Sequence, residues 1–198
     1  MAADITLVLG GARSGKSTFA EELALNGSGH VTYIATAEAK DPEMAERIAI
    51  HKKRRPSFWS TWEGNAQDIP RIISELSGTL LLDCLTLWLS RLFLDGTEAE
   101  TASEAEWNQK ELEIRLITEK LCEAPRDGTH LIIVSNEVGF GLVPPYLMGR
   151  RFRDLQGRMN QLCASKAARV VLVVAGCPLW LKGFSSMDTG NNGHQESL

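Results

Sequence analysis

Residues 5–17 read ITLVLGGARSGKS, and this stretch decides the fold. A largely apolar run leads into G-x-x-x-x-G-K-S and then into a helical pattern, the strand–loop–helix context that identifies a phosphate-binding loop. The glycines let backbone N–H groups turn onto phosphate oxygens, and the N-terminus of the following helix favours negative charge. Lys16 is expected to reach the β- and γ-phosphates, and the Ser17 hydroxyl to ligate Mg²⁺. The sequence therefore predicts a nucleoside triphosphate site built from Gly10, Gly11, Ala12, Arg13, Ser14, Gly15, Lys16 and Ser17.

Short apolar runs alternate with longer helical patterns along the rest of the chain. Their continuous rather than alternating apolar character is typical of parallel strands covered on both faces. We therefore predict an α/β P-loop NTPase of the RecA-like kind, with an open, mostly parallel sheet and helices on both faces. The expected strands are 5–9, 31–35, 79–82, 131–134 and 170–174, with a short edge strand around Thr61, and the expected helices are 16–25, 42–54, 66–77, 84–94, 104–123 and 147–166.

The composition indicates one acidic globular domain. The 198 residues include 21 Lys and Arg against 25 Asp and Glu, a net charge of −4 that argues against nucleic acid as a partner. No apolar stretch approaches the roughly 20 residues of a membrane span, and no leader segment is recognisable, so we expect a cytoplasmic protein. Residues 1–182 are expected to form a single domain, and the Gly-, Ser- and Asn-rich residues 183–198 a mobile polar tail.

The four cysteines, Cys84, Cys122, Cys163 and Cys177, are far apart and include no C-x-x-C pair. Structural zinc sites use closely spaced ligand pairs, and disulfide frameworks belong to small secreted chains. We therefore expect four buried, reduced thiols.

A carboxylate ends one of the predicted buried strands. Asp83 follows three leucines at the carboxyl end of that strand, the edge of the sheet at which ligands of such folds gather. It is a candidate for the acid that assists Mg²⁺ binding. Asp is also favoured as the N-cap of a following helix, and the two interpretations are compatible.

A histidine precedes four cations at the end of the predicted helix 42–54. His51 is followed by Lys52, Lys53, Arg54 and Arg55, and Pro56 ends the helix. Basic residues are favoured in the last turn of any helix, so a solvated helix end is one interpretation. The other is a triphosphate grip in which the cations discourage protonation of His51 and leave it a nucleophile for nucleotidyl transfer. The residues alone leave both open.

Four blocks of the chain resemble one family. GGARSGKS at 10–17, YIATAEAKDPEMAERIAIHKKRRP at 33–56, SNEVGFGLVP at 135–144 and RRFRDLQGRMNQ at 150–161 are similar to the bifunctional adenosylcobinamide kinase / adenosylcobinamide-phosphate guanylyltransferase of cobalamin biosynthesis. The resemblance implies two reactions. ATP or GTP phosphorylates the aminopropanol hydroxyl of adenosylcobinamide, and GTP then transfers GMP to that phosphate, with release of pyrophosphate.

The same resemblance implies site residues. His51 matches the guanylylated histidine of the family, and the implied nucleotide contacts are Ala35, Thr36, Ala37, Lys52, Lys53, Arg54, Arg55, Glu63 and Asp83. Glu63 is the first candidate to accept hydrogen bonds from the N1–H and N2–H₂ groups of guanine. Asp83 stands where many members carry Glu, and it is assigned either to Mg²⁺ or to the guanine edge.

Asn136 and Glu137 follow a further strand and are candidate substrate residues, with Glu137 as a base or as the group that orients the corrinoid hydroxyl; a capped turn with a solvated acid is the alternative. The resemblance also implies a homotrimer with the corrinoid site between subunits. Two other functions stay open at this point. One is a plain small-molecule kinase in which His51 is structural, and the other is a nucleotide-dependent switch that makes no small-molecule product.

Overall fold

The protein folds around a seven-stranded sheet. The computed structural model describes residues 4–27, 29–39, 42–96 and 101–183, and it describes the backbone but not the side chains of Glu43, Arg47 and His51. The predicted tail therefore lies outside the described residues from 184 onward. The strands are β1 (Asp4–Gly10), β2 (Val31–Ala35), β3 (Ser60–Glu63), β4 (Thr79–Asp83), β5 (His130–Asn136), β6 (Arg169–Val174) and β7 (Cys177–Lys182).

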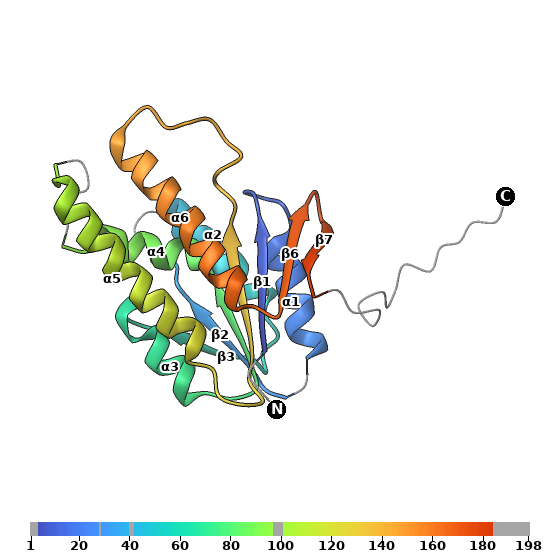
Figure 1. Ribbon diagram of the computed structural model, residues 1–198. Coiled ribbons are helices and arrows are strands. Elements are labelled where there is room, and N and C mark those ends of the chain that lie inside the picture. The colour runs from blue at the N-terminus through green and yellow to red at the C-terminus, as the bar shows by residue number, and fades with distance from the viewer. Residues whose placement is uncertain (1–3, 28, 40–41, 97–100, 184–198) are drawn as a thin grey trace.

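The helices lie on both faces of this sheet (Figure 1). They are α1 (Lys16–Asn26), α2 (Pro42–Arg54), α3 (Ile69–Glu75), α4 (Leu85–Leu94), α5 (Glu104–Glu123) and α6 (Leu147–Lys166), with a short 3₁₀ turn, η1 (Ala66–Asp68), before α3. All the predicted helices are present. The stretch predicted as one helix over 66–77 is η1 followed by α3, because Pro70 falls in the first turn of α3, where a missing N–H is tolerated.

The strand order is β3-β2-β4-β5-β1-β6-β7. Every neighbouring pair is parallel except β6 and β7, which form an antiparallel hairpin. The predicted edge strand around Thr61 is confirmed as β3. Strand β7 was not predicted from the sequence. Its start also corrects one expectation: Cys177 is exposed at the hairpin, whereas the other three cysteines are buried, and all four are free thiols.

Two apolar layers explain why the strands are continuously hydrophobic. The neighbours Leu7 and Val8 in β1 are both fully buried, but Leu7 packs toward α4, α5 and α6, and Val8 packs toward α1. Successive side chains of a strand point to opposite faces, so a strand covered on both sides needs apolar residues at every position.

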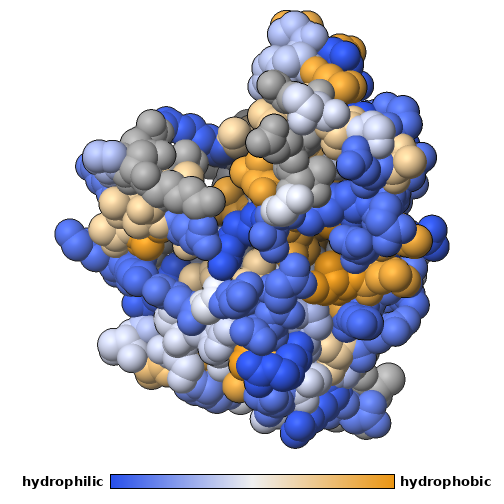
Figure 2. All heavy atoms as spheres, turned by 90° about the vertical axis from the view of Figure 1, so that its left-hand side faces the viewer, coloured by the Kyte–Doolittle hydropathy of each residue, from blue (hydrophilic) through white to orange (hydrophobic). Residues whose placement is uncertain are grey.

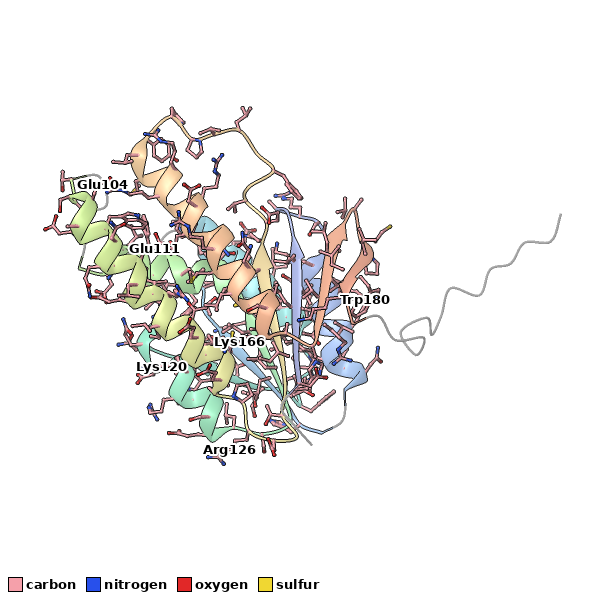
Figure 3. The ribbon with its side chains drawn as sticks, viewed as in Figure 1. Glu104, Glu111, Lys120, Arg126, Lys166 and Trp180 are labelled. Carbon is pink, nitrogen blue, oxygen red and sulfur yellow. The ribbon has the colours of Figure 1, made fainter. Side chains whose placement is uncertain are left out.

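Ion pairs join the two long helices on the outer face. Arg151 pairs with Glu104 at 2.8 Å, Arg158 with Glu111 at 2.5 Å, and Lys166 with Glu123 at 2.7 Å. Figure 3 shows Glu104 and Glu111 on α5 and Lys166 near the C-terminal end of α6. These contacts fix α6, and with it the segment 137–146, which connects β5 to α6.

The carboxyl ends of five parallel strands, β1, β2, β3, β4 and β5, meet at one edge of the sheet. Gly10 is in register with Asn136, and Ala35 is in register with both Asp83 and Glu63. The phosphate loop, the segment after β2, Asp83 and the segment after β5 are therefore placed together by topology.

Candidate nucleotide site

The phosphate loop connects β1 directly to α1. Gly15, the residue before α1, has φ of 94°, a conformation open to glycine at little cost. A Cβ at Gly10 would lie 2.7 Å from the carbonyl oxygen of Val173, so this position also requires glycine. The Lys16 ammonium donates to the carbonyl of Gly11 at 3.2 Å, which folds its side chain back over the loop. The loop thus has the backbone shape that surrounds a phosphate chain.

The hairpin between β6 and β7 supports this loop. The N–H of Gly176 donates to the carbonyl of Ser14 at 2.8 Å. Ala175 and Gly176 both have positive φ, 51° and 80°, the twist that a tight antiparallel hairpin needs. The hairpin that leads into the unpredicted strand β7 therefore stabilises the predicted loop through this backbone hydrogen bond.

Asp83 lies between the loop and β2. Its carboxylate accepts from the Tyr33 hydroxyl at 2.9 Å and lies 3.5 Å from the Ser17 hydroxyl. Burial raises the pKa of the Tyr33 hydroxyl well above its ordinary value, and the negative charge of Asp83 adds to this effect. Tyr33 consequently stays protonated and acts as a donor. The N-cap of α4 is Cys84, so Asp83 does not cap that helix.

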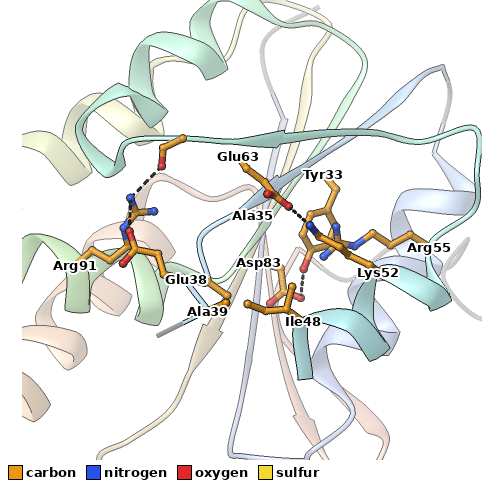
Figure 4. A pocket seen from close by; sticks show the side chains of 12 residues that line it. Tyr33, Ala35, Glu38, Ala39, Ile48, Lys52, Arg55, Glu63, Asp83 and Arg91 are labelled. Atoms are coloured by element: carbon orange, nitrogen blue, oxygen red, sulfur yellow. Dashed lines mark hydrogen bonds and ion pairs between the residues drawn. The ribbon is translucent and has the colours of Figure 1, made fainter. Parts of the chain in front are cut away.

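A pocket of about 320 Å³ opens beside Asp83 (Figure 4). It joins the ends of β2, β3 and β4 to α2 and α4. Six of its lining residues were predicted from sequence or resemblance: Ala35, Ala37, Lys52, Arg55, Glu63 and Asp83. The others include Tyr33, Glu38, Ile48 and Arg91. Residues from five separate elements thus converge on one concave site of mixed charge.

The cations at the end of α2 each have a different surrounding. Lys52 forms an ion pair with Glu63 at 2.7 Å across the pocket. Arg54 instead turns toward α1, where it pairs with Glu21 at 2.7 Å and donates to the Thr18 hydroxyl at 2.8 Å. Lys53 is exposed and does not line the pocket. The four predicted cations therefore do not act as one cluster.

Arg55 lies in the pocket wall against an aromatic ring. Its guanidinium carbon lies 3.3 Å from the centroid of the Tyr33 ring. Among the described residues its buried Nε and Nη1 atoms have no hydrogen-bond partner. Because buried donors are costly when unsatisfied, these atoms favour an anionic ligand in the pocket.

One predicted residue, Thr36, is placed differently. Thr36 is fully buried, and its hydroxyl bonds both the N–H and the carbonyl of Cys84, at 2.7 and 2.8 Å, so its side chain joins β2 to β4 and does not face the pocket. His51 belongs to α2, but its side chain lies outside the description.

Arg91, Tyr33 and Glu38 line the pocket but were not predicted. Arg91 pairs with Glu38 at 2.8 Å and donates to the carbonyl of Gly64 at 3.0 Å, which holds the segments after β2 and β3 together. Tyr33 lies inside the apolar strand β2, where the sequence predicts a residue of the hydrophobic core. Arg91 lies in an otherwise apolar helix, and a lone cation in that setting was the one available signal.

The segment after β5 lies against the phosphate loop. The N–H of Glu137 donates to the carbonyl of Gly10 at 3.0 Å, and its carboxylate accepts from the N–H of Gly139 at 2.6 Å. The second contact is the capped turn of the alternative interpretation, but the first places Glu137 at the edge that carries the loop.

Oxygen donors suited to Mg²⁺ are present at this edge. The Ser17 hydroxyl and the Asp83 carboxylate are hard ligands beside the loop, and Mg²⁺ is usually held by one or two protein oxygens together with substrate phosphates. Within the described residues there is no group of three or more His, Cys, Asp and Glu side chains that could hold a metal by itself. The residues therefore fit a metal that arrives with a nucleotide. None of the helices in the described part of the chain has the length and apolar character needed to cross a bilayer.

Fold and loop together define a P-loop nucleotide-binding α/β protein. The likeness to two solved structures shows the same fold: a Pyrococcus horikoshii OT3 protein studied as PH0250 (TM-score 0.53, 8% identity, 93% of this chain and 88% of that one) and an ATPase from the type III secretion system of pathogenic bacteria (TM-score 0.50, 14% identity, 85% and 50%). The predicted fold class is confirmed.

Sequence comparison gives the particular family. The model described as cobinamide kinase / cobinamide phosphate guanyltransferase matches residues 6–181. The bifunctional adenosylcobalamin biosynthesis protein CobP of Pseudomonas aeruginosa is 43% identical over 179 residues, covering 89% of this chain and 96% of the relative. CobU of Escherichia coli is 38% identical over 180 residues, covering 89% and 98%. The chain therefore belongs to the cobinamide kinase / cobinamide phosphate guanyltransferase family of enzymes, as its motifs predicted.

Proposed function

We propose that the protein phosphorylates adenosylcobinamide with ATP or GTP and then transfers GMP from GTP to adenosylcobinamide phosphate. Family membership along nearly the whole chain supports both reactions. The observation that carries the proposal is the pocket beside the phosphate loop, in which Lys52, Arg55, Glu63 and Asp83 converge. A plain phosphate loop needs no such second set of charges, whereas an enzyme that also transfers the nucleotide does.

In the kinase step the loop N–H groups and Lys16 hold the triphosphate. The acceptor hydroxyl attacks the γ-phosphorus, the bond to the β,γ-bridging oxygen breaks, and the nucleoside diphosphate leaves. Ser17 and Asp83 would hold Mg²⁺, which would neutralise charge on the phosphates. Glu137, beside the loop, orients the hydroxyl or accepts its proton, and Asn136 contributes to the same acceptor site.

In the transfer step an imidazole nitrogen of His51 attacks the α-phosphorus of GTP and pyrophosphate leaves. A phosphate oxygen of the corrinoid then attacks the same phosphorus, which breaks the P–N bond and frees His51. Arg55, whose buried donors lack partners among the described residues, is suited to the phosphate charge. Lys53 adds positive potential at the same helix end, whereas the charges of Lys52 and Arg54 are paired with Glu63 and Glu21.

Product analysis tests the function. The protein is incubated with adenosylcobinamide, GTP and Mg²⁺, and the corrinoids are separated by reversed-phase chromatography. We expect adenosylcobinamide phosphate and then adenosylcobinamide-GDP. Accumulation of the phosphate alone would indicate a plain kinase, and GTP hydrolysis with unchanged corrinoid would indicate a nucleotide-dependent switch.

Labelling tests the histidine step. With α-labelled GTP, the denatured wild-type chain should retain acid-labile label, and His51→Ala should retain none. His30→Ala is the matched control, because His30 is an exposed histidine that contacts Ser60 away from the pocket. Equal labelling of His51→Ala and wild type would refute the covalent step.

Three further properties belong to the proposal. We infer a homotrimer, supported by family resemblance and by the exposed apolar side chains Phe140, Leu142 and Val143 in the segment 137–146. The face in Figure 2 is mainly hydrophilic; its projecting top carries hydrophobic spheres among hydrophilic ones, and larger hydrophobic groups lie lower, near the middle of the face. Light scattering tests this state.

We also infer a catalytic domain over 1–182, supported by the end of β7 at Lys182. We further infer a cytoplasmic location, where its nucleotide substrates are made. Cell fractionation tests the location.

A further inference from the structure

A group of amide and hydroxyl side chains is buried between β5 and α6, directly beneath the segment that follows β5. Ser135 and Gln156 are fully buried, and Asn160 is 5% exposed. Gln156 and Asn160 lie one turn apart on α6, inside a helix whose other buried positions include Leu155 and Met159. Polar groups at such positions are costly unless they are hydrogen-bonded to one another.

The three side chains bond to each other and to the backbone. The Ser135 hydroxyl donates to Asn160 Oδ1 at 2.6 Å, and Gln156 Nε2 donates to both Ser135 Oγ and Asn160 Oδ1, at 2.9 and 3.0 Å. The remaining amide donor, Asn160 Nδ2, reaches the backbone carbonyl of Asn136 at 3.1 Å. The network therefore ends on the last residue of β5.

That residue is held on its other side as well. The N–H of Asn136 donates to the Thr86 hydroxyl of α4 at 2.8 Å, and the next N–H, of Glu137, donates to the Gly10 carbonyl at 3.0 Å. The peptide between Asn136 and Glu137 is thus fixed from α6 through its carbonyl and from the phosphate loop through its N–H.

Helix α6 also holds the far end of the same segment. Arg150 Nη1 donates to the carbonyls of Pro144 and Pro145, at 3.2 and 2.7 Å. One helix therefore fixes both ends of the segment 137–146, which carries the proposed acceptor residue.

The network is not the arrangement that stability alone would select. Among the described residues, Gln156 Oε1 and Asn136 Oδ1 are buried without hydrogen-bond partners. A half-satisfied buried network is less favourable than an apolar core of the same volume. Buried polar groups that lower stability in this way are expected where they hold a functional site in place.

We infer that Asn160 and Gln156 are positioning residues for phosphoryl transfer. Through the Asn136 carbonyl they hold the Asn136–Glu137 peptide against Gly10, so that the acceptor hydroxyl meets the γ-phosphate held by the loop. Neither residue touches the substrate. The inference rests on the proposed function, since it names the support of the proposed acceptor residue.

The test uses paired variants of the full chain. Asn160→Leu removes the whole contact, and Asn160→Asp keeps the acceptor for Ser135 and Gln156 but lacks the donor to the Asn136 carbonyl. Thr118→Val is the control, because Thr118 is fully buried on α5 and, among the described residues, its hydroxyl bonds only the Ile114 carbonyl of its own helix. If Asn160→Leu does not fold, Gln156→Met replaces it in the test. Gln156 acts on the peptide through its hydrogen bond to Asn160.

A misplaced acceptor is expected to lower kcat of the kinase step by about tenfold or more, because a shift of about 1 Å can cost about a hundredfold. Both Asn160 variants should show this loss while KM for the nucleotide and the Kd for a non-hydrolysable GTP analogue stay within about twofold of wild type. Gln156→Met should lose less. Thr118→Val should keep the wild-type kcat even if its Tm falls as far as the Tm of the Asn160 variants.

Hydrogen exchange gives a readout that does not depend on turnover. The amide of Glu137 should exchange faster in both Asn160 variants and at the wild-type rate in Thr118→Val. Unchanged kcat and exchange in Asn160→Asp, or losses that simply follow Tm across all variants, would overturn the positioning role. Wild-type protein without activity on adenosylcobinamide would overturn the proposed function instead, and the exchange data would still decide whether Asn160 holds the peptide.

Discussion

The guanidinium of Arg55 lies over the ring of Tyr33, 3.3 Å from its centroid, and the hydroxyl of the same ring donates to Asp83 at 2.9 Å. One aromatic side chain from β2 therefore orders both a cation at the end of α2 and the carboxylate at the end of β4. Stacking keeps the guanidinium oriented, and hydrogen bonding keeps the carboxylate oriented. Tyr33 therefore contacts and positions both a cation and a carboxylate in the pocket beside the phosphate loop.

Replacing Arg55 is expected to weaken nucleotide binding. Hydrogen bonds to charged groups are worth about 1.5–3 kcal/mol, so Arg55→Ala should raise the Kd for GTP roughly ten- to a hundredfold. Arg55→Lys should recover little, because an ammonium lacks the planar fork that stacks on the ring. Isothermal titration measures the effect. Arg71→Ala is the control, since Arg71 is an exposed arginine paired with Glu75 on α3; an equal loss there would contradict a specific role for Arg55.

Removing the Tyr33 hydroxyl is expected to act on the metal. Tyr33→Phe keeps the ring beneath Arg55 but removes the shorter of the two hydroxyl contacts to Asp83, and the loss of such an outer partner typically costs about ten- to a hundredfold in metal affinity. The Mg²⁺ concentration for half-maximal activity should rise by about that factor, with nucleotide affinity in EDTA unchanged. Unaltered Mg²⁺ dependence would show that Asp83 does not serve the metal.

Lys16→Ala is expected to abolish both activities, since each requires the triphosphate in the loop. A loss of a thousandfold or more, on the order of that for other major charge-stabilising groups, is expected for phosphorylation. Lys120→Ala, on the outer face of α5 (Figure 3), is the control. Full kinase turnover by Lys16→Ala would refute the assignment of the loop.

Acid is expected to destabilise the protein through His130. This residue begins β5, at the ends of the strands opposite the nucleotide site. Its Nε2 accepts from Arg169 at 3.1 Å and lies 2.9 Å from the Thr6 hydroxyl, while Arg169 also pairs with Asp4. Burial lowers the pKa of His130, Arg169 lowers it further, and Asp4 opposes them. Below the ordinary pKa of about 6.5 the unfolded chain binds a proton that the native state excludes, so the free energy of unfolding falls as pH falls.

The comparison that checks this uses Tm at pH 7.5 and pH 5.5. His130→Gln should show a smaller loss of Tm between the two values than wild type, whatever its absolute Tm. An equal or larger loss in the variant would assign the acid sensitivity to other groups.

The fold was predictable wherever local pattern and topology agree. The β1–loop–α1 unit, the buried parallel strands and the long helices follow from continuous apolar runs and 3.6-residue periodicity. Strand β7 was missed because Pro178 and its exposed neighbours give no alternating pattern, and only an edge strand tolerates that proline. The hairpin turn was hidden because Ala175, which is not a turn residue, adopts positive φ.

The site was predictable only in part, because motif residues do not reveal their partners. Lys52 and Arg54 are only two residues apart, yet one faces Glu63 and the other Glu21, since residues i and i+2 of a helix point to different sides. Thr36 matches the family pattern, but its hydroxyl serves Cys84. Tyr33 and Arg91 gave almost no signal, because their roles come from contacts between segments distant in sequence.

Glu63 is expected to recognise the N1–H and N2–H₂ groups of guanine. It lines the pocket from the end of β3, where its carboxylate is held by Lys52 at 2.7 Å. A carboxylate can accept two hydrogen bonds from guanine, N1–H and N2–H₂, whereas hypoxanthine offers only the first. Wild type should therefore prefer GTP over ITP in the transfer step, and Glu63→Gln should reduce that preference by about tenfold, because a lost hydrogen bond to a charged group is worth about 1.5–3 kcal/mol. The ratio of kcat/KM for the two nucleotides measures this, and Glu75→Gln, an exposed acid on α3, is the control. If the ratio is the same in Glu63→Gln and wild type, guanine is read by another group, and Glu63 serves only to hold Lys52.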